Sequence, residues 1–197
     1  MRRVTLEDII GPARYAGLRG DRRRQIIDLK RVRRVPLGDR VSVVFENFET
    51  ILFQTQEMVF VERITDLDLV RQEVEVYNGL LPEDGELSAT LLVEVTEQAQ
   101  IRPALEALVG LDEHVRLDID GRPTRALFEP GRSQADRISA VQYLRFQLDA
   151  DCRAALCRPD SRVELVADHV NYQHRTTLDE DQRASLAGDL SVPGSLA

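Results

Sequence analysis

The residues best suited to metal or redox chemistry lie in a short run near the carboxyl end of the chain. Asp168, His169, Tyr172 and His174 fall within seven residues, and the run holds two of the three histidines in the sequence. Imidazole and carboxylate side chains are natural ligands for zinc, iron and manganese. The spacing matches no standard metal motif, however, and an extended chain would point His169 and His174 to opposite faces. Structural hydrogen bonding by these residues is therefore the simpler interpretation.

A second candidate for chemistry is Glu57, in the block Gln54-Thr55-Gln56-Glu57-Met58. Apolar residues recur on one predicted helix face, and Glu57 falls inside that face. A buried carboxylate is costly unless it is paired, protonated or bound to a metal. Two interpretations stay open: a salt bridge to an arginine, for example from residues 31–34, and a mononuclear site formed with His169 and His174. Iron, zinc or manganese would be its metal, and the surrounding pocket would include Gln54, Gln56, Tyr172 and Asp168.

A third feature is the uneven distribution of charge along the chain. Residues 1–40 contain 12 basic and 5 acidic side chains, a net charge of +7, while the whole chain carries −8, which leaves −15 for residues 41–197. Such asymmetry predicts a basic segment that binds an acidic partner, with Arg31, Arg33 and Arg34 as the contact residues. The basic run from Arg19 to Arg34 has no aromatic residue between its arginines, and Tyr15 lies upstream of it. Such a run in a net-acidic protein is poorly suited to nucleic acid. A phosphorylated small molecule, a partner protein and the acidic surface of the chain itself, in cis or across a homodimer, remain open.

The elements that must position these residues follow from periodicity and turn signals. Asp120-Gly121 predicts a hairpin turn, Thr5 a helix start, and Glu46 to Glu49 a turn into a short extended run. The apolar patterns predict helices at 21–30, 53–77, 101–111, 150–156 and 178–190 and strands at 41–45, 87–95, 115–119, 124–128, 140–148 and 163–167. Without regular βαβ alternation, this order predicts an α+β fold, a largely antiparallel mixed sheet with helices packed on it. Residues 1–190 would form a single domain, with 1–40 as a basic helical segment and 191–197 as a frayed tail.

Composition narrows the class of protein. A hydrophobic fraction of 43% and a charged fraction of 30% suit a globular core. No apolar run approaches the roughly 20 residues of a membrane span, and the first residues do not read as a signal peptide. Cys152 and Cys157 cannot form a disulfide framework, so a cytoplasmic protein is expected. Gly-rich phosphate loops and standard hydrolase motifs are missing, so the sequence leaves open whether the protein is an enzyme.

Several blocks of the sequence resemble a bacterial family of uncharacterised proteins of similar length. The most specific is Gln54-x-Gln56-Glu57-Met58, and the others are Phe45-Glu46-Asn47, Ser88-Ala89-Thr90, Asp168-His169 and the run from Ala140 to Phe146. The resemblance covers almost the whole chain. Thr55, where the family has an aliphatic residue, and Val170, where it has proline, depart from the pattern. Genes of this family often lie beside genes for rubrerythrin-like and iron–sulfur oxidoreductase proteins, which implies a role in redox or peroxide defence.

Two functional hypotheses follow. The first is a non-enzymatic accessory or interaction protein of a bacterial redox system, which docks an acidic partner, or a second copy of itself, through Arg31, Arg33 and Arg34. The alternative is a metal-binding redox protein or metalloenzyme that uses His169, His174 and Glu57. The two differ in whether Glu57 and the histidines meet in one pocket.

Overall fold

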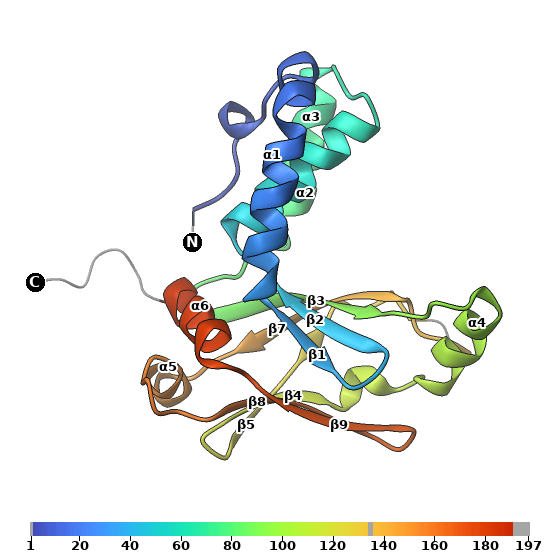
Figure 1. The fold of residues 1–197 in the computed structure, drawn as a ribbon, viewed down its shortest axis with the longest axis vertical. Coiled ribbons are helices and arrows are strands. Elements are labelled where there is room, and N and C mark those ends of the chain that lie inside the picture. The colour runs from blue at the N-terminus through green and yellow to red at the C-terminus, as the bar shows by residue number, and fades with distance from the viewer. Residues whose placement is uncertain (1, 134–135, 191–197) are drawn as a thin grey trace, which may run out of the picture.

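The described part of the chain forms two β-sheets, a helical arm and further helices at the ends of the sheets (Figure 1). A computed structural model describes residues 2–133 and 136–190, so the predicted tail at 191–197 lies outside the described residues. Every strand pairing is antiparallel, which confirms the predicted α+β class, although the strands divide between two sheets. Sheet A has the order β1 (Arg34–Leu37), β2 (Val41–Phe45), β3 (Glu86–Val93), β7 (Val141–Gln147) and β6 (Leu127–Phe128). Sheet B has the order β5 (Arg122–Arg125), β4 (Val115–Ile119), β8 (Val163–His169) and β9 (Tyr172–Thr177).

The main hydrophobic core lies between the two sheets. Successive side chains of a strand point to opposite faces, so one face of each sheet can be apolar. In β4, Val115, Leu117 and Ile119 are buried while the residues between them are half exposed. These side chains join Phe45 and Leu91 of sheet A in one cluster. Burial of this apolar surface is the main stabilising term of the body of the protein.

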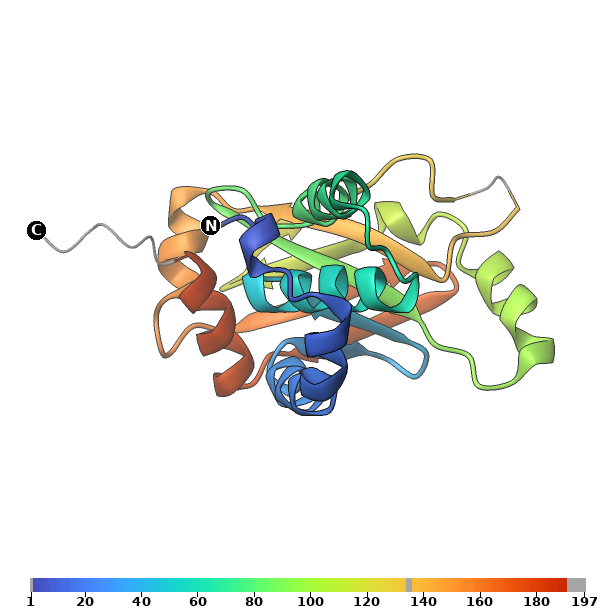
Figure 2. The ribbon, with the colours of Figure 1, turned by 90° about the horizontal axis from the view of Figure 1, so that it is seen from above.

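The arm consists of α1 (Pro12–Arg31), α2 (Phe48–Val61) and α3 (Leu67–Asn78), and it stands on the outer face of sheet A (Figures 1 and 2). It has a small core of its own, which includes Ile51, Val59 and Val74. A 3-10 turn, η1 (Leu6–Asp8), precedes α1, and its N-cap is Thr5, as predicted. The chain runs from α1 into β1, leaves again from β2 into α2, and returns from α3 to β3.

Three boundaries in the arm differ from the sequence prediction. The helix expected at 21–30 begins at Pro12, because proline is favoured in the first turn. The predicted extended run after Glu46 is the start of α2, where the Asn47 side chain accepts a hydrogen bond from the Thr50 amide. The single helix expected at 53–77 is two helices, because Arg63 adopts a positive φ of 55° and Asp66 caps α3.

Two buried side-chain amides bind the amino-terminal segment to the arm. The Asn78 amide accepts from the Val4 N–H (2.9 Å) and donates to the Val4 carbonyl (2.9 Å). The Gln56 amide makes the same pair of bonds with Ile10, at 2.7 and 3.0 Å. Each amide therefore satisfies both backbone groups of one residue, which a buried backbone requires.

The remaining helices lie at the two ends of the sandwich (Figure 2). These are α4 (Gln98–Ala107) with the 3-10 turn η2 (Leu111–Glu113) at one end, and α5 (Ala150–Leu156) and α6 (Glu180–Leu190) at the other. Within residues 2–133 and 136–190, no helix is both long and apolar enough to cross a membrane.

Candidate functional site

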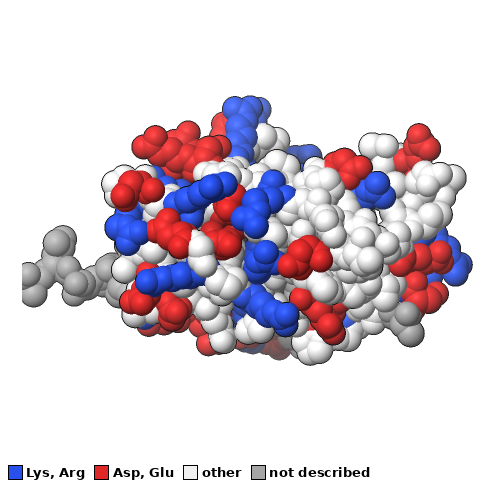
Figure 3. All heavy atoms as spheres, turned by 90° about the horizontal axis from the view of Figure 1, so that it is seen from below, with Lys and Arg blue, Asp and Glu red and all other residues white. Residues whose placement is uncertain are grey.

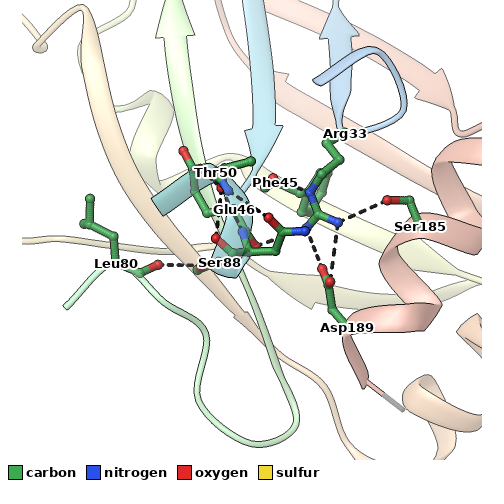
Figure 4. Close-up of polar contacts among 9 residues, drawn as sticks. Arg33, Phe45, Glu46, Thr50, Leu80, Ser88, Ser185 and Asp189 are labelled. Atoms are coloured by element: carbon green, nitrogen blue, oxygen red, sulfur yellow. Dashed lines mark hydrogen bonds and ion pairs between the residues drawn. The ribbon is translucent and has the colours of Figure 1, made fainter. Parts of the chain in front are cut away.

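A buried arginine joins the arm to the body (Figure 4). Arg33 lies between α1 and β1 and is 1% exposed. Its guanidinium donates to the carbonyls of Phe45 (2.8 Å) and Glu46 (3.1 Å) and to the Ser185 hydroxyl (3.0 Å). It also pairs with Asp189 of α6 at 2.5 Å. Arg33 is therefore not available to a partner, which corrects the prediction that it is a docking residue.

A buried carboxylate lies beside this arginine, at the end of β2. Glu46 is 3% exposed. One of its oxygens accepts from the Thr50 hydroxyl (2.5 Å) and the Gln54 amide (3.0 Å), and the other accepts from the Thr90 hydroxyl (2.6 Å). No ion pair to Glu46 occurs among the described residues. The hydrogen bonds to its carboxylate thus come from neutral donors, whereas its backbone carbonyl accepts from Arg33.

A cavity of about 270 Å³ opens at this junction, on the outer face of sheet A where the arm begins. Glu46, Ser88 and Thr90 supply polar lining groups, and Arg145 of β7 lines the cavity as well. The guanidinium of Arg145 donates to the Glu86 carboxylate (2.7 Å) and to two backbone carbonyls at the end of the arm. Apolar lining comes from Leu80, Leu127, Phe128, Pro130 and Leu144. We call this space the junction cavity.

A second hollow, of about 470 Å³, lies at the foot of α1 beside the β1–β2 hairpin. Its lining includes four cationic side chains, Lys30, Arg31, Arg34 and Arg40, and two acidic ones, Asp39 and Glu94. Arg34 pairs with Glu94 and Arg40 with Asp39, and Arg31 pairs with Asp28 just outside the groove (3.5 Å). The groove lining itself therefore has two more basic than acidic side chains. We call this hollow the basic groove. It brings together Arg31 and Arg34, two of the three predicted docking residues.

The outer face of sheet B, opposite the arm, carries both signs of charge (Figure 3). There Glu164 accepts from Arg175 (2.6 Å) and Arg162 (2.9 Å), and Asp168 pairs with Arg116 and His114. Burial opposes ionisation of Glu164, but the two arginines outweigh it and lower its pKa. Asp168, a predicted pocket residue, is therefore part of a balanced charged surface.

His169 points to the other side of its strand and is 4% exposed. Its Nε2 lies 2.9 Å from the Val109 carbonyl, and its Nδ1 lies 3.3 Å from the Asn171 amide N–H. A neutral imidazole with its proton on Nε2 satisfies both contacts. Both nitrogens are thus used in hydrogen bonds, as the simpler interpretation of this run predicted.

His174 and Tyr172 hold the β1–β2 turn. The Tyr172 hydroxyl donates to the Leu37 carbonyl (2.6 Å) and accepts from the amides of Arg40 (3.3 Å) and Val41 (3.2 Å). The His174 ring packs against Tyr172, with the ring centroids 4.4 Å apart and the ring planes tilted by 55°. Burial raises the pKa of Tyr172. This aromatic pair joins β9 to β1, the two neighbouring edges of the sandwich.

Glu57 binds within the arm, far along the chain from the histidines. It accepts from the Tyr15 hydroxyl (2.8 Å) and from Arg19 (2.8 and 2.9 Å). The salt-bridge interpretation therefore describes its contacts, with Arg19 of α1 as the partner. Gln54 and Gln56 bind Glu46 and Ile10, so the predicted pocket of Gln54, Gln56, Asp168 and Tyr172 is not assembled. In the part of the chain that the structure describes, no three metal-ligating side chains form a cluster that fits a metal ion.

The Glu57 contacts predict a loss of stability in acid. Arg19 lowers the pKa of Glu57, with Tyr15 contributing and burial opposing. A carboxylate with a lowered folded-state pKa stabilises the protein above its unfolded pKa of about 4.3, and this contribution disappears as the pH falls through the folded value. Glu57→Gln should therefore lower the free energy of unfolding by about 1–2 kcal/mol at pH 7. The deficit should shrink as the pH falls below about 4.3 in urea titrations.

Asp68→Asn, which breaks the exposed pair with Arg71, serves as the control and should cost about 0.5 kcal/mol or less. A Glu57→Gln deficit that stays constant in acid would contradict this account.

No chemical role was predicted for Glu46, Ser88, Thr90 or Arg145. Two signals for them were present. Glu46 directly follows the predicted strand 41–45, and Ser88-Ala89-Thr90 alternates polar and apolar within the strand 87–95. Alternation places Ser88 and Thr90 on one face of the sheet. Only the register of β2, β3 and β7 shows that they meet Glu46 and Arg145 there.

The protein is an α+β protein in which a helical arm stands on a sandwich of two antiparallel sheets. Buried polar groups lie where the arm meets the sandwich. Residues 3–190 match the family described as "Protein of unknown function (DUF3501)", and the chain belongs to this family. The fold is similar to the crystal structure of a novel protein of unknown function from Burkholderia pseudomallei, with a TM-score of 0.90. The two sequences are 33% identical, and the match covers 96% of this chain and 100% of that chain. A search of curated proteins found no match. The predicted membership of an uncharacterised family is therefore confirmed.

Proposed function

We propose that this protein is a non-enzymatic accessory protein that docks an acidic segment of a protein partner in the basic groove. The observation that carries the proposal is the convergence of Lys30, Arg31, Arg34 and Arg40 around one hollow. Two of the four are paired with acidic residues inside the groove, and Arg31 makes an exposed pair with Asp28 at 3.5 Å. The lining still has an excess of basic side chains, which attracts carboxylates. The exposed side chain of Ile27 on the groove wall adds an apolar contact, as protein interfaces commonly do.

The helix above the groove supports the same proposal. Within the 20 residues of α1, Tyr15 and Ile26 are the buried ones. Gly17 and Gly20 lie in its interior, where each glycine costs about 0.5–1 kcal/mol relative to alanine. A Cβ added at Gly17 would meet nothing within 4 Å, so packing inside the chain does not require this glycine. A long helix with so little burial is stabilised when a partner covers it.

The cellular context of the proposal comes from the family resemblance. Neighbouring genes for rubrerythrin-like and iron–sulfur oxidoreductase proteins imply that the partner belongs to a redox or peroxide-defence system. The partner in this proposal carries the redox centre, and the present chain supplies a docking surface. Peroxide sensitivity of a deletion strain, restored by the wild-type gene, would test this context separately from docking.

Charge reversal tests the docking surface. Arg31→Glu/Arg34→Glu removes two cations from the groove and leaves the buried Arg33 in place. We expect its affinity for a fluorescein-labelled hexaglutamate peptide, measured by anisotropy, to fall by about tenfold or more, because close charge pairs govern such binding. Arg14→Glu/Arg23→Glu, on exposed positions of α1 outside the groove, changes the net charge equally and should retain binding. Equal losses in both variants would show a general charge effect and overturn the proposal.

Self-association is the alternative use of the same surface. A second copy could supply the acidic segment, since residues 41–197 carry a net charge of −15 against −8 for the whole chain and +7 for residues 1–40. Light scattering after size exclusion distinguishes the two cases. A dimer that Arg31→Glu/Arg34→Glu dissociates assigns the groove to self-docking, whereas a monomer assigns it to a different protein.

A further inference from the structure

The two hydroxyl groups that line the junction cavity, those of Ser88 and Thr90, both donate their hydrogen bonds to acceptors within the chain. Thr90 donates to the Glu46 carboxylate (2.6 Å), and Ser88 donates to the Leu80 carbonyl (2.7 Å). A hydroxyl has one proton and two acceptor lone pairs. Ser88, Thr90 and Glu46 therefore present lone pairs to the cavity, and a complementary ligand must donate hydrogen bonds.

The charges around the cavity also favour a ligand that donates hydrogen bonds, and specifically a cation. Three guanidinium groups lie at or near its wall, and each is paired with a carboxylate: Arg33 with Asp189, Arg145 with Glu86, and Arg132 with Glu129. Glu46, by contrast, has no ion-pair partner among the described residues. A buried carboxylate without a cation is expensive, and a cationic ligand removes that cost.

The rest of the lining selects the shape of the cation. Leu80 and Leu127 form apolar walls that suit an alkyl chain, whereas the side chains of Phe128 and Leu144 pack into the core on the other face of the sheet. The volume of about 270 Å³ admits a small ligand or a single long side chain. A compact head with several N–H donors fits the acceptor end, and an alkyl stem fits the apolar end.

We propose that the junction cavity binds a primary alkylammonium group, with its N–H donors on Glu46 and the Thr90 and Ser88 hydroxyls. This site is separate from the basic groove, which attracts the opposite charge. Its ligand is either a free alkylamine or the lysine side chain of another protein, because both carry the same head and stem.

Butylammonium tests the site directly. In ¹H–¹⁵N NMR titrations of the wild-type protein, we expect saturable shifts at the Ser88 and Thr90 amides with a Kd in the roughly millimolar range or below. Glu46→Gln keeps the shape of the side chain and should weaken binding by about tenfold or more, because it removes a charged hydrogen bond. Butanol and butyrate, which match the stem but not the head, should not saturate. Equal binding of butanol, or an unchanged Kd in Glu46→Gln, would overturn the proposal.

A steric variant keeps the test decisive if Glu46→Gln does not fold. Leu127 lines the cavity and is 50% exposed, so Leu127→Trp should fill the opening and abolish the butylammonium shifts without unfolding the protein. Leu69→Trp, at an equally exposed position (50%) on α3, is the matched control and should bind normally. Normal binding in Leu127→Trp would overturn the site.

Two further probes assign the source of the amine. The two probes are 1,4-diaminobutane and a peptide that has an acetylated N-terminus and one unmodified lysine. Tighter binding of 1,4-diaminobutane would assign the site to a free amine, and tighter binding of the peptide would assign it to a lysine side chain. If neither of these probes nor butylammonium binds, the proposed site is refuted. Arg31→Glu/Arg34→Glu should bind butylammonium normally, so a failure of groove docking and a failure of this site are distinguishable.

Discussion

Replacement of Arg33 by leucine is expected to lower the free energy of unfolding by about 3–5 kcal/mol, as breaking a buried ion pair does. The guanidinium bonds to two backbone carbonyls, the Ser185 hydroxyl and Asp189. Without it, the Asp189 carboxyl is buried and unpaired, since its side chain is 9% exposed. Urea unfolding followed by circular dichroism measures the loss.

The pH dependence of this loss identifies Asp189 as its source. Burial raises the pKa of Asp189, and Arg33 opposes that rise. In the variant the opposition is gone, so the folded carboxyl holds its proton to higher pH than the unfolded one, whose pKa is about 3.9. Stability from such a raised pKa is present in acid and lost as the pH rises. The deficit of Arg33→Leu should therefore grow from about pH 4 toward pH 7.

Two comparisons sharpen this test. Arg33→Leu/Asp189→Leu removes both charges and should recover part of the loss, because an apolar pair leaves no buried charge. Arg31→Leu, two residues away on an exposed side chain, should cost about 0.5 kcal/mol or less. If Arg31→Leu costs as much as Arg33→Leu, the buried network is not what joins the arm to the body.

A second large effect is expected for Gly38→Ala in the β1–β2 turn. Gly38 has a φ of +82°, and an added Cβ would lie 2.5 Å from the His174 ring and 2.6 Å from the Tyr172 hydroxyl. The backbone conformation alone costs about 1–2 kcal/mol for a residue with a side chain. Moving the two rings would also disturb the three hydrogen bonds of the Tyr172 hydroxyl, so we expect a total of about 3 kcal/mol. Thermal and urea unfolding measure it.

Gly121→Ala provides a control that separates the two causes. Gly121 has a similar φ of +80°, but a Cβ there would meet nothing within 4 Å. Its loss should be limited to the conformational cost of about 1–2 kcal/mol. The difference between the variants then measures the contact of Gly38 with β9. Equal losses would mean that His174 and Tyr172 move aside freely.

Local signals predicted the elements that depend on neighbouring residues. The helix expected at 150–156 is α5, and Asp120-Gly121 forms the turn between β4 and β5, with a φ of +80° at the glycine. β-Branched residues bounded by turn signals located β2, and the strand predicted at 140–148 agrees with β7 to within one residue at each end. Such elements follow from turn chemistry and periodicity, which act over a few residues.

Partners that are distant in sequence were not predictable in the same way. Arg31, Arg33 and Arg34 were grouped by charge, yet Arg33 alone is buried. One signal for this was present, because Arg33 alternates with Arg34 and so shares the face of Val35, which is buried in β1. The partner of Arg33 could not be predicted from the sequence, since Asp189 lies 156 residues away. Likewise, the sequence predicted an arginine partner for Glu57, but Glu57 is only half-buried and its arginine is Arg19 rather than one at 31–34.

The Arg33–Asp189 pair also bears on the order in which the protein is synthesised and folds. The arm and the β1–β2 hairpin occupy the first part of the chain, and the contacts of Arg33 with Phe45 and Glu46 span only 12 and 13 residues, so they can form early while the chain is still being made. Asp189 belongs to α6, lies 156 residues after Arg33 and is synthesised later than these elements. Until then the Arg33 guanidinium has only the carbonyls of Phe45 and Glu46 as partners among these early residues. We therefore expect docking of α6 onto Arg33 to follow formation of the arm and the hairpin, and a nascent chain that lacks α6 to expose this charge to chaperones and proteases.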